Sequence, residues 1–288
     1  MGSKWGSMFF IVLGHACMEA MNVAGYKTAE DIVKTPLSYN AASTNPWTYL
    51  LLSGQLCVDT FLFISGFLLS FVGCKRPVPV VLGTLLRYAR LMPLFGFVML
   101  TYICVVPYLA WGPFSPRLQS DVHDSCQGSA WWSEFLFVSD WYPWFNLNGG
   151  CMGWSWYLSI DMTFAIVGMV LLNIWKLSRP AGWALTLLLA VACIVVTMQQ
   201  SVHYDLDYDI VSPSFSTYAH YLYFRPYTRF PGFALGLVTP WALDAMEKRG
   251  LRRGSQPTFL AARVVVLSCS MLAVGILSFS MTLMACGT

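Results

Sequence analysis

Hydrophobic residues run along this chain in seven long stretches separated by shorter polar segments. An α-helix rises 1.5 Å per residue, so about 20 apolar residues cross the hydrocarbon core of a bilayer, which is about 30 Å thick. The pattern predicts membrane-spanning helices at residues 7–24, 50–72, 83–111, 154–175, 181–199, 229–246 and 260–284. In lipid each span must satisfy its own backbone polar groups. The fold class that we predict is therefore all-α, a polytopic transmembrane helical bundle of about seven spans over residues 1–288.

Composition supports a membrane protein over a soluble one. Hydrophobic residues make up 57% of the chain and charged residues only 11%, with a mean hydropathy of +0.58. We interpret the first stretch as a span and not as a cleaved signal peptide, because a signal peptide would not carry His15 and Glu19 inside its apolar region. The net charge of +3 says nothing about nucleic acid, since the basic residues fall in short loops, and we expect no nucleic-acid partner.

The distribution of basic residues predicts an orientation. Alternate loops and span ends collect 12 of the 17 lysines and arginines, which favours a cytosolic N-terminus for a multi-pass protein of the plasma membrane or an endomembrane. The loops at 25–49, 112–153 and 200–228 would then lie on the exoplasmic side. Cys126 and Cys151 lie in or beside the second of these loops, where the environment is oxidising, and we predict that they form a disulfide. The alternative is two free thiols.

The first span carries ionisable residues where hydrocarbon would be expected. Lys4 precedes His15 by eleven residues, roughly 16 Å along a helix, which places His15 near the middle of the membrane. Glu19 follows one turn later on the same face, and a carboxylate behind an imidazole raises its basicity, as a general base requires. The alternative is a neutral structural histidine, with Glu19 facing exoplasmic water.

Acidic residues also occur inside two later spans. Asp59 lies about one turn from the exoplasmic end of the second span, where it either caps the helix or contributes to a site. Asp161 lies deeper in the fourth span, on the face of Tyr157, and no basic residue is near it in that span. We therefore predict a partner for Asp161 elsewhere in the bundle, with His15 or an arginine as the candidates.

Two pairs of arginines are further candidates. Arg87 and Arg90 occupy one helix face at the cytosolic end of the third span, as either lipid-interface residues or a clamp for an anionic donor. Arg225 and Arg229 are the basic residues of an otherwise acidic exoplasmic loop that Pro226, Pro231 and Gly232 are expected to make irregular. That position suggests binding of an acidic or polyhydroxyl ligand, or pairing with Asp161.

Five stretches occur in the order typical of one family. They are "K-x10-H" with "VLGH", "VDTFLFISGFLLS", "RYARLMPL", "CMGWSWYLSIDMTF" and "YFRPYTRFPGFALG". Together they resemble the acyltransferase-3 family, most of all its animal-type "nose resistant to fluoxetine" branch. The resemblance implies an integral-membrane enzyme that moves an acyl group, other than an aminoacyl group, from cytosolic acyl-CoA to a hydroxyl of a carbohydrate, lipid or small-molecule acceptor.

The resemblance also implies roles for particular residues. The essential basic residue and histidine of the family motif correspond to Lys4 and His15, with lysine in place of the commoner arginine. Asp161 falls on a motif position and joins them as a catalytic candidate, whereas Glu19 is inferred from its spacing alone. The expected donor and substrate ligands are Arg87, Arg90, Arg225, Arg229, Tyr157 and Asp59. We expect no metal and no bound cofactor, with acyl-CoA as co-substrate and membrane lipid as the surrounding partner.

The chain departs from the family pattern in three ways. The family typically has about ten spans, its usual Leu-Asp-Gly lead-in is replaced here by "MGS", and the exoplasmic N-terminal domain of the animal branch is not seen. We therefore expect the acyltransferase-like domain to be incomplete at both ends. Two other functions stay open: a lipid or small-molecule transporter, and a catalytically dead truncated family member. A transporter would be expected to show inverted repeats, and their absence from the sequence favours the enzyme.

Overall fold

The computed structural model describes residue 12 and residues 54–74, 79–109, 112, 115–126, 131–142, 151–206 and 215–248. These residues form helices and connecting turns, and no strand occurs among them. The predicted spans 7–24, apart from Val12, and 260–284 lie outside the described residues. The all-helical class is thus confirmed for the described part of the chain.

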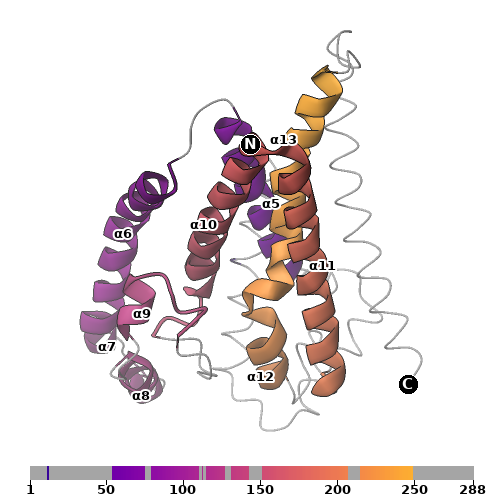
Figure 1. Cartoon of the computed structure of the whole chain (residues 1–288). Helices are drawn as coiled ribbons and strands as arrows, with labels where there is room; N and C mark the ends of the chain where they lie inside the picture. Colours follow the sequence, from indigo (N-terminus) through magenta and orange to yellow (C-terminus); the bar gives the residue numbers. More distant parts are fainter. Residues whose placement is uncertain are drawn as a thin grey trace. The chain divides into compact units, whose positions relative to one another are not determined.

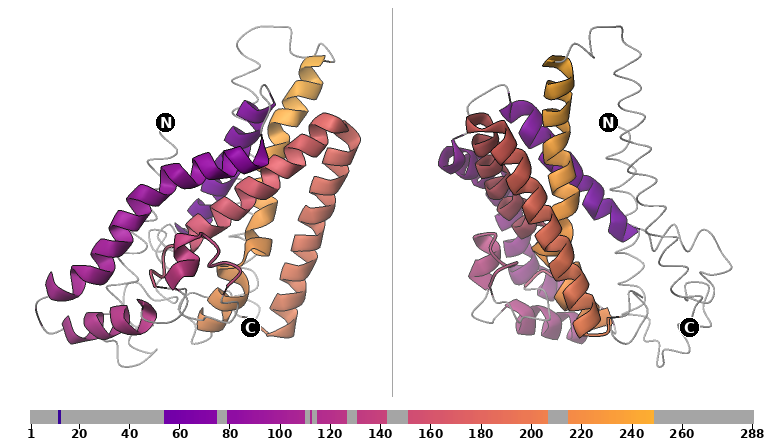
Figure 2. Two further views of the ribbon diagram at one scale, coloured as in Figure 1. Left: turned by 60° about the vertical axis from the view of Figure 1, so that its left-hand side comes forward. Right: turned by 45° about the vertical axis from the view of Figure 1, so that its right-hand side comes forward.

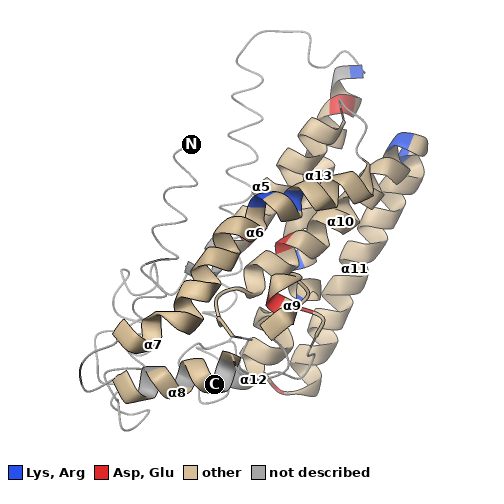
Figure 3. Cartoon of the chain, turned by 90° about the vertical axis from the view of Figure 1, so that its left-hand side faces the viewer, with Lys and Arg blue, Asp and Glu red and all other residues tan. Residues whose placement is uncertain are grey.

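The helices follow one another along the chain as shown in Figure 1. They are α5 (Gly54–Gly73), α6 (Val80–Cys104), α7 (Val106–Leu109), α8 (Ser115–Cys126), α9 (Trp131–Phe135), α10 (Trp156–Leu177), α11 (Arg179–His203), α12 (Phe215–Tyr218), the π-helix η1 (Ala219–Tyr223) and α13 (Pro226–Lys248). By length and composition α6, α10 and α11 are apolar enough to cross a membrane, and α5 contains a shorter apolar stretch, Val58–Gly73. Figure 3 shows how few charged positions these helices carry. The other predicted spans remain predictions.

The chain divides into two compact units. The larger unit comprises Leu62–Asp207 and Ser212–Val238, and the smaller one comprises Met1–Phe61, Tyr208–Val211 and Thr239–Thr288. Helices α5 and α13 contribute to both units. The candidate site described below lies wholly in the larger unit.

Helix α10 forms the centre of the larger unit. Both views of Figure 2 show it beside α11, to which the single residue Ser178 joins it as a helical hairpin. Gly182 of α11 faces Trp175 of α10 so closely that a Cβ atom there would clash with the tryptophan. Half of the residues of α10 are buried, whereas α6 and α11 expose long rows of leucine and valine. Exposed apolar rows of this kind are expected on helices that face lipid.

Glycines allow α5 and α13 to cross in close contact. A Cβ atom at Gly66 of α5 would lie 2.5 Å from the carbonyl oxygen of Phe233, and one at Gly236 of α13 would clash with the carbonyl oxygen of Phe63. A Cβ atom at Gly168 of α10 would lie 2.7 Å from the side chain of Leu69 and 2.8 Å from the ring of Phe233. Small residues at helix crossings are the usual means by which membrane helices approach one another.

A cluster of buried hydrophobic residues surrounds the C-terminal half of α6. Phe95 and Met99 pack there with buried residues from α8, from the 131–142 segment and from the start of α10: Val122, Cys126, Phe137, Cys151, Met152 and Met162. The sulfurs of Cys126 and Cys151 are placed as a disulfide, as the sequence predicts. The side of the membrane on which this pair lies remains a prediction.

The structure corrects three expectations of local structure. The predicted loop 112–153 contains helices α8 and α9. Helix α13 begins at Pro226, not at 229, and continues through Pro231 and Gly232. Proline is tolerated in the first turn because the first backbone N–H groups of a helix have no intrahelical acceptor. Arg229 therefore lies in a helix and not in an irregular loop.

Candidate functional site

An ion pair joins α6 to α10 inside the larger unit. Nη2 of Arg87 lies 2.5 Å from Oδ2 of Asp161, and the two side chains are 19% and 13% exposed. The prediction that Asp161 has a basic partner is thereby confirmed, and the partner is an arginine of α6. Neither Arg225 nor Arg229 takes this position.

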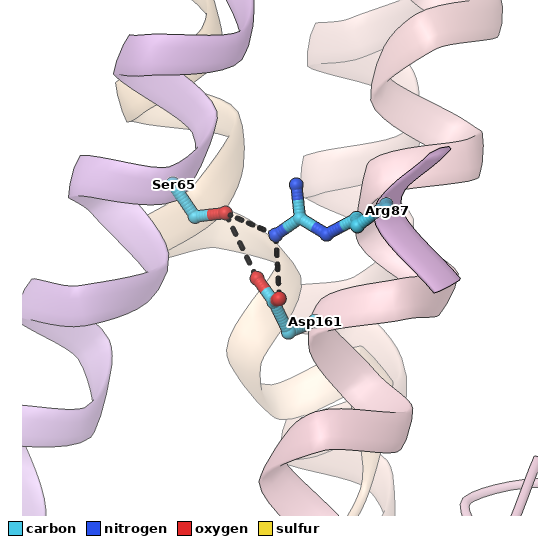
Figure 4. A network of polar contacts seen from close by, with 3 residues as sticks. All are labelled: Ser65, Arg87 and Asp161. Atoms are coloured by element: carbon cyan, nitrogen blue, oxygen red, sulfur yellow. Dashed lines mark hydrogen bonds and ion pairs between the residues drawn. The ribbon is translucent and has the colours of Figure 1, made fainter. Parts of the chain in front are cut away.

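Ser65 of α5 completes the arrangement (Figure 4). Its hydroxyl donates a hydrogen bond to Oδ1 of Asp161 at 2.8 Å and accepts one from Nη2 of Arg87 at 3.1 Å. We call Ser65, Arg87 and Asp161 the polar node. Each of its three bonds joins a different pair of helices, so the node ties α5, α6 and α10 together. The sequence analysis assigned Ser65 no role in this contact.

A glycine brings the two charged residues together. Gly83 precedes Arg87 by about one helical turn, and a Cβ atom at Gly83 would lie 2.6 Å from the sulfur of Met169 on α10. The absence of a side chain there lets α6 approach α10 closely. About one turn further along α6, Arg87 lies opposite Asp161, which is just over one turn from the start of α10.

The polar node holds two opposite charges that are largely shielded from solvent. Burying either charge alone would be costly, and pairing with hydrogen bonds on the remaining lone pairs offsets that cost. Ser65 satisfies the second carboxylate oxygen. The Nε–H of Arg87 is buried and makes no hydrogen bond within the described part of the chain. A buried donor without an acceptor is unfavourable by about 1–3 kcal/mol, which makes this N–H a ready ligand for an oxygen atom.

The neighbouring candidates are placed differently. Arg90 is exposed, so the two arginines of α6 are not equivalent. Tyr157, one turn before Asp161, interacts electrostatically with both Asp161 and Arg87. Asp59 lies in the part of α5 that belongs to the smaller unit, where it has an interaction of its own. Lys4, His15 and Glu19 lie outside the described residues.

Arg225 is buried just before α13, and not exposed as a loop position would suggest. Its Nε–H donates to the carbonyl oxygen of His220 at 2.7 Å, and Nη2 lies 3.2 Å from Nε2 of the same histidine. Burial, followed by the charge of Arg225, lowers the pKa of His220 and keeps the imidazole neutral. Nothing in the sequence around His220 indicated this contact.

Arg229 is buried among aromatic rings. Its guanidinium lies 4.6 Å from the ring centre of Tyr223 and 5.7 Å from that of Trp156, and its Nε–H donates to the carbonyl oxygen of Tyr223 at 3.3 Å. These are cation–π distances. Trp156 is itself buried, so it is a packing residue of this cluster.

Two buried acids were missed by the sequence analysis. Asp140 accepts hydrogen bonds from the hydroxyls of Ser159 and Thr163 on α10, the second at 2.9 Å. Glu134 of α9 accepts from the backbone N–H of Met152 at 3.2 Å. Burial raises the pKa of both carboxyls, and that of Glu134 to about 7. Their spacing within an aromatic run, "WWSEFLFVSDW", was the available signal. Within the described residues no cluster of His, Cys, Asp or Glu is placed to hold a metal ion.

Comparison with known proteins identifies the family. The model described as "Acyltransferase domain", that of the acyltransferase-3 family, matches residues 2–285. The chain belongs to the acyltransferase-3 family. It is 26% identical over 275 residues to "Nose resistant to fluoxetine protein 6" of Caenorhabditis elegans, a match that covers 86% of this chain and 32% of that protein.

A second relative gives a similar picture. The chain is 25% identical over 242 residues to "Regulator of hypoxia-inducible factor 1" of the same organism, covering 76% of this chain and 46% of that protein. The chain thus spans about a third of the length of the first relative and a little under half of the length of the second. No solved structure matches it.

Proposed function

We propose that this chain forms the acyl-transferring part of an integral-membrane O-acyltransferase, which uses cytosolic acyl-CoA to acylate a hydroxyl of a carbohydrate, lipid or small-molecule acceptor. The observation that carries the proposal is the polar node, an ionised pair inside the helical bundle of an acyltransferase-3 family member. Charged groups among membrane helices are costly and are typically kept for function. A node that joins three helices is a rigid base on which a reacting group can be positioned.

The chemistry assigned to the chain is a direct transfer. A neutral hydroxyl is a poor nucleophile, so a general base must take its proton as it attacks the thioester carbonyl. We assign this role to His15, with Glu19 orienting the imidazole and Lys4 anchoring the span at the cytosolic face. The new C–O bond forms as the C–S bond breaks, and the CoA sulfur leaves as a thiolate that takes up a proton.

The node serves this reaction on the donor side. Asp161 neutralises Arg87 and holds it through one Nη atom, which leaves the buried Nε–H of Arg87 for an oxygen of the donor. Arg90, exposed and about one turn further along α6, supplies the uncompensated positive charge that attracts the CoA phosphates. Tyr157 is the candidate to border the acyl group, since it lies beside both charged members of the node.

Arg225 and Arg229 are proposed to shape the acceptor side. Both guanidinium groups are buried against His220 and aromatic rings. They are therefore better suited to positioning the residues that line a substrate site than to binding a ligand from solvent directly.

The experiment that tests the proposal is thiol release from acyl-CoA. The chain is purified in detergent, and CoA release from acetyl-CoA and longer acyl-CoAs is followed with and without simple hydroxyl acceptors. We expect release that is lost in His15→Ala and kept in His203→Ala, a matched change at an exposed histidine of α11. Equal release from the His15→Ala variant and the unaltered chain would overturn the catalytic role of His15.

A further inference from the structure

In the segment 131–142, which contains α9 and the turn after it, large apolar side chains are exposed and acidic side chains are buried. Its exposed side chains are all aromatic or aliphatic: Trp131, Trp132, Leu136, Trp141 and Tyr142. Its two acids, Glu134 and Asp140, are 1% and 4% exposed. We call the five exposed side chains the aromatic face. In a loop surrounded by water the opposite arrangement is expected, with acids outside and large apolar groups inside.

Hydrogen bonds fix this inversion. The carboxylate of Glu134 is held by the backbone N–H of Met152, beside the disulfide, and that of Asp140 by the hydroxyls of Ser159 and Thr163 on α10. Each acid therefore anchors the segment from its inner side. The aromatic face is the consequence, because it consists of the positions that these two anchors turn outward.

The end of α9 contributes a third anchor. The backbone N–H of Val138 bonds to the carbonyl of Ser133 at 2.8 Å, and that of Phe137 to the carbonyl of Glu134 at 3.0 Å, which is the Schellman pattern of a helix C-terminus. The pattern places a left-handed residue at Phe137, whose φ is 54°, where glycine is the usual choice. The Phe137 ring instead packs on Tyr88 and Phe95, which compensates for the unfavourable backbone.

The polar atom of one exposed tryptophan is already satisfied by the protein. The indole N–H of Trp141 donates to Oγ1 of Thr163 at 3.1 Å, while 54% of the residue remains exposed. Trp132 and Tyr142 stack on each other with ring centres 5.3 Å apart and both remain exposed. Tryptophan and tyrosine combine an apolar ring with one polar atom that needs a hydrogen-bond partner. Such side chains are typical of the region where the lipid headgroups lie.

We infer that the aromatic face lies in the boundary between headgroups and acyl chains of the bilayer, so that phospholipid is the partner of segment 131–142. The segment follows the membrane surface as an interfacial anchor, and does not project into water as part of an exoplasmic loop. Its hydrogen bonds to α10, a helix of membrane-spanning length, hold it next to the point where that helix begins. This inference concerns the seating of the protein and does not depend on the proposed enzymatic reaction.

Fluorescence quenching by brominated lipid tests the inference. The full chain is reconstituted in phosphatidylcholine nanodiscs in which bromine is attached either near the carbonyl end or near the methyl end of the acyl chain. Emission is compared between the unaltered chain and the Trp131→Phe and Trp141→Phe variants, and the difference reports each tryptophan by itself. Trp175→Phe is the control, because Trp175 is buried in α10.

We expect lipid bromine to quench the emission of Trp131 and of Trp141, which is the emission that the two variants lose. Bromine near the carbonyl end of the acyl chain should quench it more strongly than bromine near the methyl end. The emission lost in Trp175→Phe should respond weakly to both lipids. Quenching of Trp131 and Trp141 by aqueous iodide in place of lipid bromine would show a water-exposed loop and overturn the inference. Protection from both quenchers would show that protein covers the aromatic face, and would also overturn it. Trp131 and Trp141 are tested by separate variants, so one variant that folds is sufficient to test the inference.

Discussion

Arg87 and Asp161, 74 positions apart in the chain, are joined by an ion pair of 2.5 Å, and Ser65 bonds to both. The relationship links three helices, α5, α6 and α10, through polar side chains. It gives Asp161, an acid within a helix of membrane-spanning length, a partner that lowers the cost of its charge. It also leaves one buried donor of Arg87 available.

Breaking the ion pair should destabilise the protein strongly. In Asp161→Asn or Arg87→Met the remaining charge is buried without its partner, a change expected to cost about 3–5 kcal/mol of unfolding free energy. Thermal or denaturant unfolding in detergent measures it. The matched control is the exposed pair of Lys248 and Asp244 on α13, where Asp244→Asn should cost less than about 1 kcal/mol. Similar costs at the two sites would contradict the burial of the node.

Ser65 should contribute less than the ion pair but more than an ordinary helix hydroxyl. Ser65→Ala removes one hydrogen bond to each charged group, and hydrogen bonds to charged groups contribute about 1.5–3 kcal/mol. Thr197→Ala is the comparison, because the hydroxyl of Thr197 bonds to the carbonyl of Cys193 in its own helix and joins no second helix among the described residues. Unfolding midpoints of both variants give the answer. Equal, small losses would mean that Ser65 only packs between the helices and would contradict its role in the polar node.

The sequence predicted the long helices well, because a membrane-length apolar run leaves few alternatives. The predicted span 154–175 corresponds to α10, which is shifted by two residues toward the C-terminus, and the predicted span 181–199 corresponds to α11, which is longer at both ends. The need of Asp161 for a basic partner was also predictable, because an isolated carboxylate among apolar helices is unfavourable. The choice of Arg87 was not. It depends on the close approach of α6 at Gly83, which no single-sequence pattern encodes.

The short helices and buried acids could not be predicted for a different reason. Glu134 and Asp140 have the composition of loop residues, and only the fold shows that their carboxylates turn toward Met152 and α10. The start of α13 at Pro226 was missed because proline and glycine together were taken to end a helix. His15, whose role is the most specific expectation, lies outside the described residues and remains a prediction.

The crossing of α5 and α13 should not tolerate a methyl group. Gly66→Ala would place a carbon 2.5 Å from the carbonyl oxygen of Phe233, which forces the helix backbones apart and is expected to cost about 1–3 kcal/mol. Gly96→Ala on α6 is the control, since the nearest atom to its new carbon is the flexible end of Met92 at 3.4 Å. Unfolding in detergent should separate the two variants. A Gly66→Ala protein as stable as Gly96→Ala would contradict the close approach.

Glu134 should make the stability depend on pH. Its pKa is raised from 4.5 to about 7 by burial, so between these values the folded protein binds more protons than the unfolded chain. The contribution of Glu134 to stability is therefore fully present below pH 4.5 and is lost as the pH rises toward 7, by at most roughly 3 kcal/mol, since one pKa unit corresponds to 1.36 kcal/mol. Unfolding midpoints across this range should show a smaller pH dependence in Glu134→Gln. Parallel curves for the two proteins would contradict this assignment.

The central claim, that the polar node serves acyl transfer as well as folding, is tested most directly by the double variant Arg87→Met with Asp161→Leu. Replacing a buried ion pair by apolar groups is often neutral or stabilising, so this variant should regain much of the stability that each single change loses. Its CoA release from acyl-CoA is then measured beside that of the unaltered chain. We predict a stable protein without release. A stable double variant that releases CoA at the unaltered rate would contradict the claim and leave the node a purely structural role.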